Sequence, residues 1–493
     1  MSPHTQKNFL RLAVLPLAAA VLVAAGCGGG TMTTATQSSS GETGPAFLIG
    51  TDAPLAAVVS MQVTLSDVYL TTATSSTPNS LVQGSPTVDF ARYNGLQGLV
   101  DMVDVPAGTY TGVTFVLGTG TVTWLNTSGG GAPTTSSAPA AFSSTTVTVP
   151  LPNPLVVGDK TPPVGVRLDF DLSKSIATSG GQIVTNSSGQ VEVTPTFDIT
   201  TVARGDAGAH IDELIGGLVS VPTSTTEPSS FVIEGPHGEN FTIETTSNTE
   251  WDGNASLASL NSNSIVAVAG ELDPSDQTLD ADEVAIISDK GFYAGGLVTY
   301  VTPSSGQATD MQMYVRGVLP SQLSAATLGD IANITITGNE NYGIYWMHNA
   351  FTNLVFNADA LAPGQEITVG GADPTASPFT VNRIHLHNWG YNGTIVAGSQ
   401  SAAANVFGTN GTFTMTVNGF AGQVISSNVT VYLGPDCDFR YGLAETGFPG
   451  LTDGATVRVV GILLKNQANG QLVLLARHVD GLTFTDMTTA AAQ

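Results

Sequence analysis

The sequence predicts an all-β protein, with an N-terminal β-sandwich followed by three tandem small β-barrel-like repeat units. Apolar and polar residues alternate along many short segments, as at Met61, Val63 and Leu65 with Gln62 and Thr64 between them. This period of two is typical of half-buried strands. Gly, Pro, Asn and Ser separate the segments, and helical periodicity is weak. Many short strands joined by such turns are typical of sandwiches and barrels.

The first 26 residues have the features of a cleaved secretory signal. Two basic residues, Lys7 and Arg11, precede an apolar run that ends in the sequence AAGC at Cys27. The run is too short to span a hydrocarbon core of about 30 Å. Small residues directly before a cysteine resemble the lipobox of bacterial lipoproteins, and the resemblance implies lipidation of Cys27. The alternative is an ordinary signal peptide with an incidental cysteine.

Residues 27–45 are rich in Gly, Thr and Ser and predict a flexible tether. No second long apolar run occurs, so lipid at Cys27 is the membrane partner that we expect. We therefore expect a lipid-anchored protein of the cell envelope, at the outer membrane, on its periplasmic face or the cell surface. The second cysteine, Cys437, lies between Asp436 and Asp438, which disfavour a thiolate, so we expect a buried structural thiol.

An ordered set of motifs marks a first domain at residues 46–206. The motifs are TDAP at 51–54, VPAGTY at 105–110, LDFDLSKSI at 168–176 and VTPTF at 193–197. This set resembles the bacterial and archaeal lipoprotein domain of unknown function 4382, which implies a β-sandwich and no established activity. The compact segment LQGLVD at 96–101 departs from the family, and we expect a short helix or turn over residues 96–103. Residues 126–146 predict a mobile loop, because Gly, Ser, Thr and Ala dominate them.

The remaining chain predicts three repeat units, at residues 212–290, 293–390 and 392–482. Each opens on a glycine-led strand, has a later strand ending in Gly270, Gly370 or Gly461, and closes on a further strand. This cadence resembles a second bacterial family, domain of unknown function 5666, and the first repeat matches best. Small barrels of the oligonucleotide/oligosaccharide-binding kind fit the units. The middle unit departs most, through an aromatic-rich insertion near 339–356.

Charge narrows the choice of partners. The chain has 14 Lys and Arg against 39 Asp and Glu, a formal net charge of −25. A nucleic-acid partner is therefore not expected, because binding needs a basic face. Docking onto an anionic membrane through charge is disfavoured for the same reason. The acids between Asp273 and Glu283 lack the spacing of an EF-hand loop, and a solvated turn is favoured over a calcium site.

No short catalytic motif or cofactor signature occurs in the sequence. His385 and His387 form the sharpest metal candidate, because residues i and i+2 of a strand point to one face. Asp373 or His348 would supply the third ligand. The alternative is a pair of half-exposed histidines at the end of a strand.

Aromatic residues are densest in the middle repeat. Tyr345, Trp346, Trp389 and Tyr391 are candidates for stacking on sugar rings. Packing in the core of the repeat is the alternative. Together, these observations predict a lipid-anchored protein with a non-catalytic binding or scaffolding role, for a carbohydrate or protein ligand. An envelope enzyme acting on polysaccharide and an adhesin or assembly component stay open.

Overall fold

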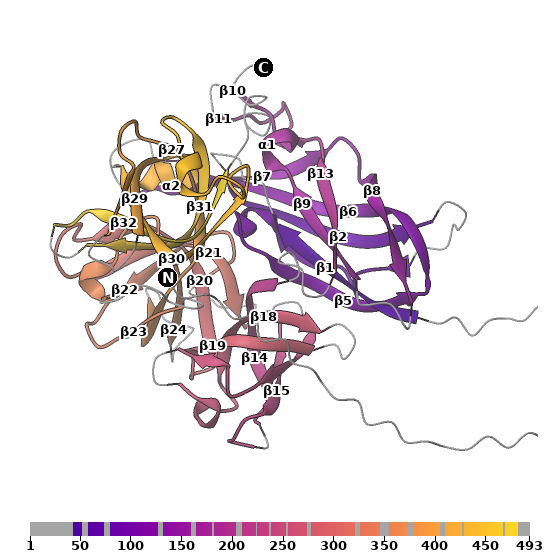
Figure 1. The fold of residues 1–493 in the computed structure, drawn as a ribbon, viewed down its shortest axis with the longest axis horizontal. Helices are drawn as coiled ribbons and strands as arrows, with labels where there is room; N and C mark the ends of the chain where they lie inside the picture. The colour runs from indigo at the N-terminus through magenta and orange to yellow at the C-terminus, as the bar shows by residue number, and fades with distance from the viewer. Residues whose placement is uncertain are drawn as a thin grey trace, which may run out of the picture. The chain divides into compact units, whose positions relative to one another are not determined.

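The computed structural model describes residues 43–51, 58–72, 79–126, 132–158, 164–179, 182–203, 210–222, 224–235, 238–252, 255–273, 278–320, 326–345, 354–371, 379–404, 410–425, 428–466 and 469–481. Strands dominate these residues, and the predicted all-β fold class is confirmed (Figure 1). Within them, no helix is long and apolar enough to cross a membrane.

The first part of the chain is a sandwich of two sheets. The first sheet has the order β13-β9-β1-β5, with bounds Phe197–Ala203, Val164–Phe170, Thr43–Thr51 and Gly98–Pro106. The second has the order β12-β7-β6-β2-β3, with bounds Val191–Val193, Thr134–Phe142, Gly108–Asn126, Val58–Thr71 and Asn79–Ser80. Strands β4 (Thr87–Asp89) and β8 (Thr146–Val157) pair with β2 and β6.

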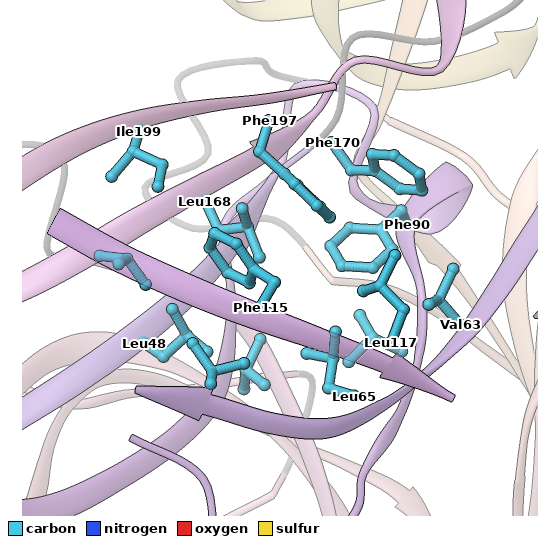
Figure 2. Packing of buried hydrophobic residues seen from close by; sticks show 14 of the residues in the cluster. Leu48, Val63, Leu65, Phe90, Phe115, Leu117, Leu168, Phe170, Phe197 and Ile199 are labelled. Carbon is cyan, nitrogen blue, oxygen red and sulfur yellow. The ribbon is translucent and has the colours of Figure 1, made fainter. Parts of the chain in front are cut away.

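Aromatic and aliphatic side chains fill the space between these two sheets (Figure 2). Phe197 stacks on Phe115 at 4.4 Å and on Phe170 at 4.7 Å between ring centroids. Phe90 meets Phe170 edge-on at 5.1 Å. Phe90 begins the short 3₁₀ helix η1 (Phe90–Tyr93), so the core fixes the start of the segment that follows it.

Two local expectations for this domain are wrong. Most of the loop expected at 126–146 is strand β7, which pairs with β6 from Thr121↔Pro139 to Asn126↔Thr134. Its small residues suit a ladder because the backbone supplies the bonds, and Thr123 and Ser137 add a hydroxyl contact of 2.9 Å. The turn or helix expected at 96–103 is instead the start of β5.

Three small barrels follow the sandwich, each built on five main strands, of which the third and the fifth are each divided in two in barrel 2. Barrel 1 contains β14 (His210–Ser220), β15 (Ser229–Glu234), β16 (Asn240–Thr245), β18 (Ile265–Asp273) and β19 (Thr278–Ser288), with the short β17 (Glu250–Trp251) beside β19. Barrel 2 contains β20 (Phe292–Thr302), β21 (Asp310–Leu319), β22 (Ile331–Thr335), β23 (Asn341–Ile344), β24 (Glu366–Gly371), β25 (Phe379–Thr380) and β26 (Arg383–His387). Barrel 3 contains β27 (Trp389–Ile395), β28 (Ser401–Ala404), β29 (Asn410–Val417), β30 (Val429–Tyr441), β31 (Thr456–Lys465) and β32 (Leu472–Gly481), with helix α2 (Gly419–Val424).

Barrels 1 and 3 close in the same way. The first main strand pairs with the second and the fourth, and the third runs parallel to the fifth, as β16 does to β19 and β30 to β32. This connectivity is that of the OB-fold. Barrel 2 has the same order, but two short parallel pairs, β22–β25 and β23–β26, replace the single closing pair. The middle unit therefore departs from the other two at its closing strands.

The recurring glycine of the fourth main strand has a steric cause in barrels 1 and 3. A Cβ on Gly270 would lie 2.1 Å from the carbonyl oxygen of Asp280, and one on Gly461 would lie 2.0 Å from that of Leu475. Both glycines adjoin an irregularity in strand register. The glycine thus permits a bulge that lets the sheet curve into a small barrel.

The apolar clusters cross from one β unit to the next. Phe47 and Ile49 of the sandwich pack with the interior residues of barrel 1. Val59 of the sandwich belongs to the same cluster as the interior of barrel 3. Leu475 of barrel 3 belongs to the cluster formed mainly by barrel 2. The sandwich and the barrels therefore bury apolar surface against one another instead of standing as separate modules.

Candidate functional site

The described aromatic candidates are interior residues. Tyr345, Trp389 and Tyr391 are 3 %, 3 % and 1 % exposed, and Trp346 lies outside the described residues. Trp389 meets Tyr391 edge-on at 5.3 Å, and the Tyr391 hydroxyl donates to the Gly364 carbonyl at 2.9 Å. These three side chains form no exposed stacking surface, so the core-packing alternative describes them.

The two histidines lie on β26 and are also buried. Leu386 between them points into the apolar core, so both imidazoles lie on the opposite face of the strand. Burial lowers the pKa of His385 to about 3, with the His387 and Arg383 charges acting in the same direction. His387 Nδ1 lies 2.5 Å from Glu213 Oε1, and its Nε2 shares a 2.8 Å hydrogen bond with Thr368 Oγ1.

The surroundings of the histidines do not resemble a metal centre. Both nitrogens of His387 already contact protein atoms. Asp373 and His348, the expected third ligands, lie outside the described residues. Among the residues with described positions, no group of three His, Cys, Asp or Glu side chains is arranged to hold a metal ion.

The structure describes one of the two cysteines, Cys437. Cys27 lies outside the described residues. Cys437 is half-buried, and burial together with the Asp438 charge raises the pKa of its thiol to about 12. A thiol of that kind is protonated at neutral pH and is a poor nucleophile.

Among the described residues, several polar contacts that are buried or partly buried gather where one short segment of the sandwich meets the barrels. We call residues 92–97 the junction segment. Arg92 Nη2 lies 2.7 Å from Glu213 Oε2 of barrel 1. The backbone N–H of Gln97 donates to Asp212 Oδ2 of barrel 1 at 2.8 Å. The backbone N–H of Asp212 donates in return to the backbone carbonyl of Gln97 at 3.1 Å.

The same segment reaches barrel 3 through a glycine turn. Asn94 Nδ2 donates to the Gly390 carbonyl of β27 at 2.7 Å. Gly95 has a positive φ of 75°, and an added Cβ would lie 2.7 Å from Val460 Cγ2 of β31. Both the backbone conformation and the close approach therefore require glycine at this position.

Barrel 2 meets the sandwich through a second arginine. Arg316 on β21 donates to the Val59 carbonyl of β2 at 3.3 Å and pairs with Glu366 of β24 at 3.2 Å. Its guanidinium lies 4.7 Å from the ring centroid of Trp389, a cation–π contact with barrel 3. Arg316 is 4 % exposed, so these contacts are formed away from bulk water.

The barrels also bind one another directly. Arg477 of barrel 3 pairs with Asp212 of barrel 1 at 2.7 Å. Arg383 of barrel 2 donates to the Ile286 carbonyl of barrel 1 at 3.3 Å. Gln365 of barrel 2 donates to the Leu463 carbonyl of barrel 3 at 3.1 Å. Each pair of barrels is thus linked by at least one directed bond.

The pKa values of two carboxylates at the junction, Glu213 and Glu366, are shifted in opposite directions. Burial acts to raise the pKa of Glu213, but His387 and Arg92 outweigh it and hold that pKa at about 2. Burial raises the pKa of Glu366, and the attraction of Arg316 and Arg92 only partly offsets it. Glu213 is therefore the carboxylate that stays ionised, between the Arg92 guanidinium and the His387 imidazole.

The space left among these side chains is small. They enclose a cavity of about 10 Å³, whose lining includes Arg92, Glu213, Tyr293, Arg316, Gly317, Glu366, Thr368 and His387. That volume accommodates about one water molecule. Ligand sites for small organic molecules are usually some hundreds of Å³. The cavity is therefore part of a structural junction and does not admit a substrate.

The junction was not predicted from the sequence. Arg92 and Glu213 are 121 residues apart, and Asn94 and Gly390 are 296 apart, so no local pattern connects them. The available signals were an Asn-Gly turn at 94–95 and an arginine beside it in a chain with only 14 basic residues. The departure of the 96–101 segment from its family falls at the same place.

The described residues define an all-β protein in which a sandwich is locked to three five-stranded barrels. Residues 47–195 match the family model described as Domain of unknown function (DUF4382), and residues 220–285 match Domain of unknown function (DUF5666). Both resemblances predicted from the sequence are confirmed, in the same order, and the second match falls on the first repeat.

Other comparisons add little. No curated protein matches the chain. The solved structure of drosophila Unr CSD456 is 11 % identical, with a TM-score of 0.14, over 55 % of this chain and 97 % of that chain. A deletion mutant of the single-stranded DNA binding protein from Thermus aquaticus is 12 % identical, with a TM-score of 0.17, over 56 % and 96 %. Both TM-scores are too low for either likeness to carry an argument.

Proposed function

We propose that this protein is a lipid-anchored, non-catalytic scaffold of the cell envelope. The observation that carries the proposal is the junction segment, which makes directed bonds to barrels 1 and 3 and lies beside barrel 2. A scaffold has to keep distant surfaces in a fixed arrangement. Buried ion pairs and hydrogen bonds serve that purpose because their geometry is directional and misplacing one partner leaves a charge unpaired in the interior.

The distribution of charge supports a scaffold with an acidic exterior. Of the ten Lys and Arg side chains that the structure describes, seven take part in ion pairs with Asp or Glu. Much of the basic charge is therefore neutralised within the protein, while acids remain in large excess. Such an exterior repels nucleic-acid phosphates. We therefore do not propose an oligonucleotide as the ligand of these barrels, although they have the OB topology.

The same charge suits a body that stands away from the bilayer. Lipid at Cys27 would attach the chain. Residues 43–45 of the predicted tether belong to β1, so the sixteen residues 27–42 would span roughly 22 Å if they form a flexible coil. Anionic lipid headgroups would repel the acidic body. Anchor and repulsion together would hold the sandwich and barrels off the membrane surface.

Distance measurements between spin labels test the scaffold. Thr146 of the sandwich and Ser230 of barrel 1 are exposed and would be changed to Cys in a Cys437→Ser background. Pulsed electron spin resonance should give one narrow distance distribution. A broad distribution, like that of domains joined by a flexible linker, would contradict a fixed arrangement.

Membrane fractionation tests the anchor separately. We expect the wild-type protein in the membrane fraction after expression with its own leader, and Cys27→Ser in the soluble fraction. Cys437→Ser is the matched control and should stay with the membrane. Wild-type protein released without lipid would contradict the anchor while leaving the scaffold untouched.

A further inference from the structure

The contact between Arg92 and the barrels has the composition of a receptor for a guanidinium group. Arg92 extends from η1 of the sandwich, whereas the groups around its charged end come from barrels 1 and 2. Glu213 supplies the ion pair, Tyr293 an aromatic wall and Glu366 a second carboxylate. The ligand and its site thus belong to different β units of one chain.

Glu213 is held in position from its far side. One carboxylate oxygen, Oε2, faces Arg92 Nη2 at 2.7 Å, and the other faces His387 Nδ1. His387 is in turn oriented by its hydrogen bond to Thr368. The carboxylate is therefore fixed by barrel residues and does not depend on Arg92 for its orientation.

A glycine makes room for the tyrosine hydroxyl beside the guanidinium. A Cβ on Gly317 of β21 would lie 2.8 Å from the Tyr293 hydroxyl oxygen and 3.6 Å from Arg92 Nη1. A larger residue at this position would therefore clash with the tyrosine hydroxyl, which lines the site together with Arg92. With Arg92 in place, the remaining cavity of about 10 Å³ holds at most about one water molecule, so the side chain fills the site.

We propose that barrels 1 and 2 form a guanidinium-binding site, which Arg92 occupies within the chain and which accepts an alkylguanidinium from solution when the Arg92 side chain is removed. The fit is defined by covalent structure. Truncating arginine to alanine removes two methylene carbons and the guanidinium, and these atoms together are N-ethylguanidinium. The guanidinium presents its N–H donors in one plane, with Nη2 on Glu213 Oε2 and Nη1 beside Gly317, whereas an ammonium group is a compact point charge that cannot reach both places.

Binding of N-ethylguanidinium to Arg92→Ala tests the proposal. We expect saturable one-to-one binding in titration calorimetry and a rise in the thermal midpoint of the variant toward that of wild type. N-ethylammonium at the same concentration should give neither effect. Wild-type protein should not respond to N-ethylguanidinium, and neither should Arg167→Ala, which removes a half-buried arginine hydrogen-bonded to Thr200 in the same sandwich.

A second variant keeps the test decisive. Arg92→Ala combined with Glu213→Gln should lose N-ethylguanidinium binding by at least tenfold, because the carboxylate that pairs with the ion is gone. If Arg92→Ala does not fold alone, refolding with N-ethylguanidinium, and not with N-ethylammonium, should recover folded protein. Folded Arg92→Ala that binds N-ethylguanidinium no better than wild type, or refolding that the ion does not improve, would overturn the proposal. Either failure would leave the scaffold intact, since that rests on fixed distances.

Discussion

Barrels 1 and 3 share one strand order and carry very different charge. Residues 210–290 hold 15 Asp and Glu against a single Lys, whereas residues 389–481 hold 5 Asp and Glu against 4 Lys and Arg. Both barrels nevertheless close through the same parallel pairing and the same bulge glycine. The comparison teaches that apolar alternation and a few glycines specify the barrel, while its charged residues are free to serve other purposes.

One of those purposes is docking. Barrel 1 contributes Asp212 and Glu213 to the contacts with its neighbours, and the neighbours contribute Arg92 and Arg477. The acidic barrel 1 thus forms ion pairs with arginines of its neighbours, in a chain that has only 14 Lys and Arg. Outside these contacts barrel 1 keeps like charges side by side, with Asp280 paired in register to both Glu244 and Glu271.

Glu213→Gln should produce the largest loss of stability. It removes the charge that pairs with Arg92, whose side chain is 25 % exposed, and with His387, and losing a hydrogen bond between charged groups typically costs about 1.5–3 kcal/mol. Chemical denaturation of the folded protein measures the difference. Glu234→Gln, an exposed glutamate of the same barrel, is the control. Equal effects of the two substitutions would show that the junction contributes nothing special.

The loss of stability at acidic pH should depend on the same carboxylate, Glu213. The pKa of Glu213 is lowered from 4.5 to about 2. Its stabilisation is therefore complete above about pH 4.5 and is lost as the pH falls toward 2, an effect of roughly 3 kcal/mol. Glu366 acts with the opposite sign, because its pKa is raised. Denaturation between pH 5 and 2 should show a shallower loss in Glu213→Gln, and parallel profiles would contradict this assignment.

The bulge glycines should matter equally in the two barrels despite their charge. Gly270→Ala and Gly461→Ala each place a Cβ against a backbone carbonyl and should cost about 1–3 kcal/mol through backbone displacement. Gly217→Ala is the control, because an added Cβ meets nothing within 4 Å, and we expect little change. A large loss in one barrel only would break the structural equivalence of the two.

Removing one acid from the registered row of barrel 1 should have the smallest effect. Glu271→Gln relieves the repulsion with Asp280 across the β18–β19 pair, so we expect a gain of about 0.2–1 kcal/mol. The gain should shrink in high salt, which screens exposed charges. Thermal melts at two salt concentrations measure it. A loss of stability at low salt would mean that Glu271 is held by attraction.

Periodicity carried most of the fold prediction. In strands such as β2 and β15, the apolar residues that alternate in the sequence are the buried ones. The recurring glycine of the fourth main strand reflects a steric need in barrels 1 and 3. Strand β7 escaped prediction because backbone hydrogen bonds hold it, and its Thr, Ser and Ala side chains have no apolar period. A composition rich in these small residues therefore predicts a loop.

The junction could not be predicted for a different reason. Its bonds join residues that are distant along the chain, and each partner alone is an ordinary polar residue at a turn or a strand end. Trp389 and His387 were noticed for their chemistry, but their burial follows from the packing of the barrels against the sandwich. Side chains that looked suited to a ligand instead bind other parts of the same protein.

Hydrogen exchange in Glu213→Gln tests most directly whether the sandwich and barrels are one body. The substitution lies in barrel 1, so its effect on amides of β9 in the sandwich and β31 in barrel 3 reports how far the lesion spreads. We predict that the slowest-exchanging amides of all three regions lose protection by the same factor, because they open together. A loss of protection confined to barrel 1, with β9 and β31 unchanged, would contradict the account.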